Sequence, residues 1–162
     1  MATTRNEKDA CDLLDADHKA VKKMFAAYDE LAGSKARGAA DKRLQLAKTI
    51  CTELSVHAQI EEEIFYPALR AVFKETDLLA EAEVEHAGAK DLIAQIEEGE
   101  TADEMFDAKV KVLGEYIDHH VKEERNEIFP KARANRKLDL VAMRGDLEAR
   151  KEELKAEMGV AA

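Results

Sequence analysis

Apolar residues recur three and four positions apart along most of this chain, which is the spacing that places them on one face of an α-helix. Four long segments show this pattern, at about residues 9–32, 41–72, 76–99 and 101–135. In the first segment the apolar positions are Leu14, Val21, Phe25 and Tyr28. A helix buries such a face against other helices, so the pattern predicts an all-α, up-down-up-down four-helix bundle.

Short connections separate the four segments, as antiparallel neighbours in a bundle require. Residues 33–38 read GSKARG and end the first helix. Thr76 and Asp77 can cap the third helix, and Gly99 ends it. Residues 101–104 fit a capping box and predict the start of the fourth helix.

A fifth segment, at about residues 138–158, is highly charged and has leucines seven residues apart, at Leu140, Leu147 and Leu154. We interpret it as an additional C-terminal helix laid along the bundle, with a partner-binding arm as the alternative. No linker is visible, so we expect a single domain over residues 1–162. The bundle would occupy about 9–135, and the helical extension would follow it.

The chain is strongly acidic, with a formal net charge of -10 over 162 residues. This charge argues against nucleic acid and anionic membranes as partners. No apolar run reaches transmembrane length, the first residues lack a signal-peptide core, and a cytoplasmic protein is expected. Cys11 and Cys51 have neither metal-motif nor redox-motif spacing, which is typical of free thiols in a reducing compartment.

One motif occurs twice, late in the second and fourth segments. HAQIEEEIFYP ends at Pro67, and HVKEERNEIFP ends at Pro130. Each proline lacks a backbone N–H, so we expect each helix to bend or thin there. Each copy begins with a His and a Glu four residues apart, which lie on one helix face. The aligned pairs are His57 with Glu61 and His120 with Glu124.

Four of the five histidines fall on the inward faces of the four predicted helices. They are His18, His57, His86 and His120, and they are joined there by Glu61 and Glu124. The midpoints between successive histidines fall at residues 37–38, 71–72 and 103, in or next to the three connections. The four imidazoles should therefore lie at one height in the bundle. Burying such groups without partners costs several kcal/mol each, so they must satisfy one another or bind something.

Four imidazoles and two carboxylates exceed what one tetrahedral zinc ion needs. They suit two first-row ions, with iron or manganese fitting mixed N and O ligands better than calcium or magnesium. Glu61 and Glu124 would bridge the two ions. The terminal pairs would be His18 with His57 and His86 with His120. Structural histidines in a plain helical interaction protein are the alternative.

Other polar and aromatic residues near these positions have simpler interpretations. His119 is rotated about 100° from its neighbour His120 and should face outward or a neighbouring helix. Four further glutamates are expected on the solvated face, namely Glu62, Glu63, Glu123 and Glu127. Core packing is expected for the three tyrosines Tyr28, Tyr66 and Tyr116.

Over about residues 9–135 the chain resembles the hemerythrin-like proteins, also called the HHE cation-binding domain. The resemblance rests on His18, His86 and the two His-x-x-x-Glu motifs, each followed by an aromatic residue and proline. It implies a non-haem di-iron centre of two iron ions (Fe2+/Fe3+) with a bridging oxo or hydroxo group. One iron would keep a position where O2 binds.

The chain departs from the oxygen-carrying hemerythrins in two places. Those proteins have two histidines one turn apart on the third helix, whereas Ala82 and Lys90 flank His86 here. Their last carboxylate is an Asp five residues after its His, whereas here Glu124 follows at four. One imidazole fewer implies an additional exchangeable position on iron.

The resulting hypothesis is a di-iron protein that binds O2, peroxide or nitric oxide for sensing, storage or stress protection. The missing third-helix histidine makes an enzyme the alternative, with peroxidase-like or nitric oxide reductase activity on the same centre. Whether the chain is an enzyme, and which protein it contacts, stays open at this point.

Overall fold

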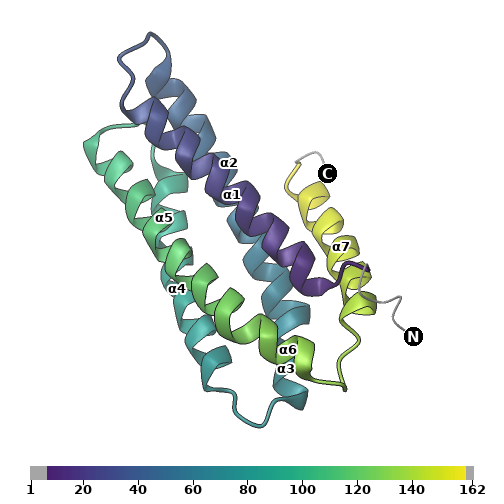
Figure 1. Cartoon of the computed structure of the whole chain (residues 1–162). Helices are drawn as coiled ribbons and strands as arrows, with labels where there is room; N and C mark the ends of the chain where they lie inside the picture. The colour runs from purple at the N-terminus through teal and green to yellow at the C-terminus, as the bar shows by residue number, and fades with distance from the viewer. Residues whose placement is uncertain (1–6, 160–162) are drawn as a thin grey trace.

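The computed structural model describes residues 7–159, and this part of the chain is helical without strands. Four long helices form the predicted up-down-up-down bundle, in which each packs against its two neighbours (Figure 1). They are α1 (Ala10–Ala32), α2 (Ala39–Ile60), α4 (Asp77–Glu98) and α5 (Glu104–Glu123). The prediction of an all-α four-helix bundle is therefore confirmed. None of the helices described between residues 7 and 159 is long and apolar enough to cross a membrane.

The second and fourth predicted helices are each interrupted by a π-helical segment. Glu61–Phe65 separates α2 from α3 (Tyr66–Val72), and Glu124–Ile128 separates α5 from α6 (Phe129–Ala134). The sequence predicted a bend or thinning at the prolines, but the change begins earlier, directly at the two motif glutamates.

Backbone hydrogen bonds explain where these wider turns form. The N–H of Tyr66 donates to the carbonyl of Glu61, and that of Phe129 donates to the carbonyl of Glu124. Each bond spans five residues and immediately precedes a proline, which cannot donate the next one. Glu61 and Phe65, the first and last residues of one of these segments, are both fully buried.

The C-terminal segment forms α7 (Leu140–Glu157), which lies against α1 and α2 on the outside of the bundle (Figure 1). Its buried face consists of Leu140, Met143, Leu147 and Leu154. The seven-residue leucine spacing thus corresponds to a docked helix, which supports that interpretation over a free arm.

Two helix starts differ in detail from their predicted caps. The fourth helix is capped by Asp103, whose Oδ1 accepts from the N–H of Phe106 at 2.9 Å, and not by Thr101. Asp bonds a helix N-terminus as well as Thr does, and a start two residues later satisfies the same donors. Thr76 occupies the N-cap of α4, but its side chain makes no capping hydrogen bond.

The apolar core consists of two clusters on either side of a polar layer. One cluster contains residues such as Leu14, Ile60 and Leu79, and the buried face of α7 belongs to it. The other contains Val21, Leu54 and further residues toward the opposite end of the bundle. The histidines lie between them.

Both cysteines are free and fully buried, Cys11 in the first cluster and Cys51 in the second. Burial raises the pKa of each thiol to about 12. We therefore expect neither thiol to react with a water-soluble disulfide reagent at pH 8 in the native protein, and both to react in denaturant. Rapid reaction in the native state would contradict this packing.

Candidate metal centre

The buried polar side chains in the described part of the chain are the six residues singled out in the sequence. They are His18, His57, Glu61, His86, His120 and Glu124, all less than 10% exposed, with both glutamates at 0%. Each of the four long helices or its π-helical continuation contributes at least one of them. The structure therefore brings the whole predicted set to one level.

The histidines approach one another in the predicted pairs. The ring centroids of His18 and His57 are 4.9 Å apart, and those of His86 and His120 are also 4.9 Å apart. Within the second pair, the two Nε2 atoms lie 3.2 Å from each other.

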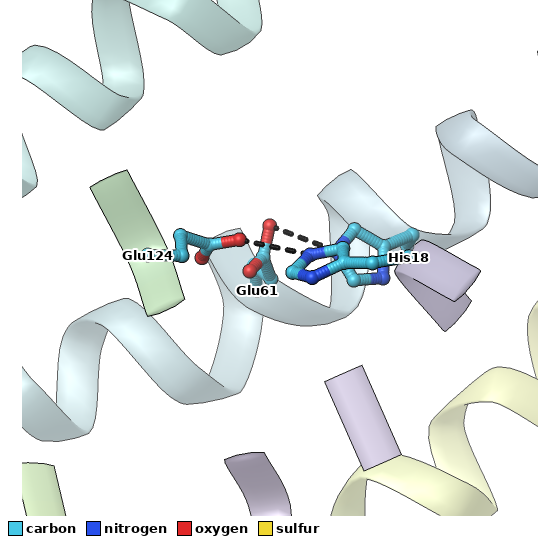
Figure 2. Close-up of side chains that lie close together, drawn as sticks. His18, Glu61 and Glu124 are labelled. Atoms are coloured by element: carbon cyan, nitrogen blue, oxygen red, sulfur yellow. Dashed lines mark ion pairs between the residues drawn. The ribbon is translucent and has the colours of Figure 1, made fainter. Parts of the chain in front are cut away.

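The two carboxylates lie between these imidazole pairs. Oε1 of Glu61 is 3.4 Å from Nε2 of His57 and 3.2 Å from Nε2 of His86. Oε1 of Glu124 is 3.0 Å from Nε2 of His18 (Figure 2). The same oxygen is 3.5 Å from Nε2 of His120. Each glutamate thus reaches one imidazole of each pair, as a bridging carboxylate must.

In three of the imidazoles, Nδ1 contacts a carboxylate on the side of the ring away from the centre. Asp17 lies 3.0 Å from Nδ1 of His57, and Glu85 lies 2.8 Å from Nδ1 of His120. Glu62 lies 2.8 Å from Nδ1 of His86. This arrangement fixes the ring and turns Nε2 toward the centre. At His18 the carboxylate of Asp15 is more distant, at 3.4 Å from Nδ1.

These supporting acids were not identified from the sequence, and Glu62 had been assigned to the solvated face. Asp17 and Glu85 each immediately precede a histidine of their own helix, but each contacts the histidine of the neighbouring helix. The signal in the sequence was an acidic residue directly before His18 and before His86, the two histidines outside the repeated motif. In a chain with 35 acidic residues that signal is weak.

Tyr66 adds a hydroxyl to the buried layer. Its side chain is 2% exposed, and its hydroxyl donates to Oε2 of Glu124 at 2.8 Å and lies 3.3 Å from Nε2 of His120. Burial and the charges of Glu124 and Glu61 raise its pKa well above the usual range, so the phenol keeps its proton. Core packing was expected for Tyr66, and it also has this polar role.

The two central carboxylates have opposite pKa shifts. Burial acts to raise the pKa of Glu61, but the charge of His57 and contacts with Glu124, His57 and His86 together outweigh it and hold that pKa well below the usual range. Burial and then the charge of Glu61 raise the pKa of Glu124. Two buried carboxylates therefore compete for the positive charge available, and a bound cation would relieve both.

The residues fit a metal ion because several buried atoms lack hydrogen-bond partners within residues 7–159. These atoms are both ring nitrogens of His18, Nε2 of His57, both oxygens of Glu61 and Oε1 of Glu124. An unpaired buried group costs about 1–3 kcal/mol. Two sets lie close enough to share an ion, His18–His57–Glu61–Glu124 and Glu61–His86–His120. Glu61 belongs to both sets, so two ions would share it.

The remaining residues considered in the sequence lie farther from the centre. His119 has a 69% exposed side chain near Glu85 and Glu123, so the prediction that it faces outward is confirmed. Ala82 is buried in the apolar core, and Lys90 forms an ion pair with Glu62 at 2.6 Å. Neither supplies a seventh ligand.

A small cavity adjoins all four histidines on the side of the second apolar cluster. Its volume is about 30 Å³. The apolar part of its lining includes Val21, Leu54, Ala89, Ile93 and Ile117. A space of this size admits a molecule as small as water. Its apolar walls favour an uncharged guest.

The fold and the buried cluster of four histidines and two glutamates together define a metal-binding helical bundle. The sequence model of the hemerythrin HHE cation binding domain matches residues 9–132, and the chain belongs to this family.

Two known proteins are similar to the chain. One is a hemerythrin HHE cation binding domain-containing protein from Mycobacterium kansasii, whose crystal structure matches with a TM-score of 0.72. It is 21% identical, and the match covers 93% of this chain and 89% of that one, which supports the fold. The other is a protein of Nostoc sp. (strain PCC 7120) named DNA nickase, 31% identical over 86 residues. The match covers 53% of this chain, and the chain spans only 24% of that protein.

Proposed function

We propose that the protein is a non-haem di-iron protein that binds O2, peroxide or nitric oxide for sensing, storage or stress protection. The observation that carries the proposal is the set of imidazole and carboxylate atoms that are buried at one level of the bundle without hydrogen-bond partners within residues 7–159. Iron or manganese suits this mixture of nitrogen and oxygen donors, and the resemblance to the oxygen-carrying hemerythrins favours iron.

His18 and His57 would hold one ion, and His86 and His120 the other. Glu61 and Glu124 would bridge them, because each lies between the two imidazole pairs. When bound, the ions supply the electrons that an oxidant such as O2 accepts, and an oxo or hydroxo group would complete the bridge. The chain itself contributes rigid imidazoles, exclusion of water and the apolar cavity in which a small guest can lie.

An enzyme on the same centre is the second candidate, with peroxidase-like or nitric oxide reductase activity. The phenol of Tyr66, 2.8 Å from Glu124, favours this alternative, because it holds a proton beside a carboxylate of the candidate metal centre. Six protein ligands for two ions also leave positions open for exchange.

We do not extend the DNA nicking named for the Nostoc protein to this chain, because its net charge of -10 opposes approach to a phosphate backbone. The two free, buried thiols suit a reducing compartment, and we propose a cytoplasmic location.

The proposal is tested by anaerobic loading with Fe(II), followed by metal analysis and optical spectra before and after exposure to O2. We expect two irons per chain and a new ligand-to-iron charge-transfer band. Fewer than two irons per chain would overturn the di-iron assignment. Sustained turnover of peroxide or nitric oxide, without a stable O2 adduct, would select the enzyme.

A further inference from the structure

The C-terminal helix reaches the buried centre through one side chain. Lys151 of α7 places its Nζ 2.5 Å from Oδ1 of Asp17, and Oδ2 of the same carboxylate lies 3.0 Å from Nδ1 of His57. Lys151 is 26% exposed and Asp17 is 13% exposed, so the contact is largely shielded from solvent. A continuous chain of contacts therefore joins α7 to one imidazole of the centre.

The other half of the centre has its own support from within the bundle. Oε2 of Glu62 lies 2.8 Å from Nδ1 of His86, and Oε1 of Glu62 lies 2.6 Å from Nζ of Lys90 on α4, whose side chain is 52% exposed. Glu85 occupies the position equivalent to Asp17, one residue before the histidine of its helix, and its Oε1 contacts Nδ1 of His120. Its second oxygen lies 3.6 Å from the exposed His119, and no lysine or arginine is paired with it among the described residues. α7 packs on α1, α2 and the π-helical segment Glu61–Phe65. Within residues 7–159, its contact with the acids that hold the imidazoles is the ion pair of Lys151 with Asp17, so α7 supports His57.

We propose that Lys151 is a positioning residue that fixes His57 through Asp17, so that the docking of α7 contributes to one of the two metal positions. This inference rests on the proposed metal centre. Without Lys151, Oδ1 of Asp17 loses its partner and can turn toward the solvent-filled groove of about 610 Å³ between α1 and α7. His57 then loses its fixed orientation, because Asp17 is the carboxylate that holds its Nδ1.

Three variants separate positioning from simple docking of α7. Lys151→Met removes the charge, and Lys151→Arg keeps a cation at the same place. Lys155→Met is the matched control, because Lys155 lies one turn farther along α7 and pairs with Glu53 at 3.1 Å. Glu53 lies on α2 and contacts none of the four imidazoles.

The measurement is a titration of each metal-free protein with Co(II), followed by its d–d absorption. We expect two equivalents in the unmodified protein. In Lys151→Met the affinity for one of them should fall about 10-fold, the lower end of the effect of supporting contacts on metal ligands. The d–d absorption band of the Co(II) bound at that position should also shift. Lys151→Arg should restore both the affinity and the band, and Lys155→Met should match the unmodified protein.

The outcomes distinguish the inference from the proposed function. If the unmodified protein binds no Co(II), both are overturned. If the unmodified protein binds two equivalents and Lys151→Met binds them equally well, the inference alone is wrong. The inference alone is also wrong if Lys155→Met loses as much affinity as Lys151→Met. Cys11 lies in the apolar cluster that contains the buried face of α7. If its thiol stays unreactive toward a disulfide reagent in each variant, the helix is still docked.

Discussion

Glu61→Gln is expected to abolish the binding of at least one of the two metal ions. Glu61 is the residue common to both candidate ligand sets, and both of its oxygens are buried without a hydrogen-bond partner. Glutamine keeps the size of the side chain but removes the negative charge, and its amide nitrogen cannot bind a cation.

The loss of metal binding in Glu61→Gln should be visible in thermal stability as well as in metal content. Metal at about 100 times its Kd stabilises a protein by about 2.7 kcal/mol, which corresponds to roughly 5–10 °C in Tm for a chain of this size. We expect Fe(II) or Co(II) to raise the Tm of the unmodified protein by at least this much. In Glu61→Gln most of that increase should disappear, as measured by thermal unfolding with and without metal.

Glu63→Gln is the matched control for this experiment. Glu63 lies in the same π-helical segment, but its carboxylate faces outward and pairs with Arg150 at 2.7 Å. Its replacement removes the same charge from the same turn and should leave the metal-dependent Tm increase unchanged. An equal loss in both variants would show that net charge, and not ligation, controls metal binding.

The buried positions of the candidate ligands could be predicted from the sequence because helical periodicity constrains them closely. His18, His57, His86 and His120 continue the apolar faces of their helices, and short connections fix the height of each helix relative to the next. A buried imidazole at each of these positions therefore follows from spacing alone. The same reasoning placed Glu61 and Glu124, which lie one turn after their histidines.

The supporting contacts could not be predicted in the same way. Asp17 lies next to His18 in the sequence, yet it contacts His57 across the interface between α1 and α2. Which neighbouring histidine an acid reaches depends on the rotation of each helix about its axis. The π-helical segments alter that rotation after Glu61 and Glu124, and single-residue patterns do not reveal such a change.

The two copies of the motif also differ where their aromatic residues align. Tyr66 bonds Glu124 through its hydroxyl, whereas the equivalent Phe129 stacks near His18 with ring centroids 6.0 Å apart. His57 is supported through Asp17 by Lys151 from outside the bundle, whereas His86 is supported through Glu62 by Lys90 from within it. These differences make the two halves of a repeated motif chemically different. Unequal halves suit a centre in which one ion is held firmly and the other exchanges ligands.

Tyr66→Phe is therefore expected to destabilise the metal-free protein by about 1.5–3 kcal/mol, the usual contribution of a hydrogen bond to a charged group. The variant leaves Oε2 of Glu124 unpaired in a fully buried position, where water cannot replace the phenol. Urea unfolding of the metal-free proteins measures the difference. With Co(II) bound, the d–d spectrum should also change, because the hydroxyl contacts a carboxylate that ligates the ion.

Tyr28→Phe is the control for this prediction. Tyr28 is equally buried and donates to Asp107, but that carboxylate is 31% exposed and keeps its ion pair with Arg43 at 3.1 Å. We expect a cost of about 1 kcal/mol or less and an unchanged Co(II) spectrum. Equal destabilisation by the two variants, with neither spectrum altered, would show that the Tyr66 hydroxyl acts only in packing. A spectral change confined to Tyr66→Phe would place that hydroxyl beside the metal ligands.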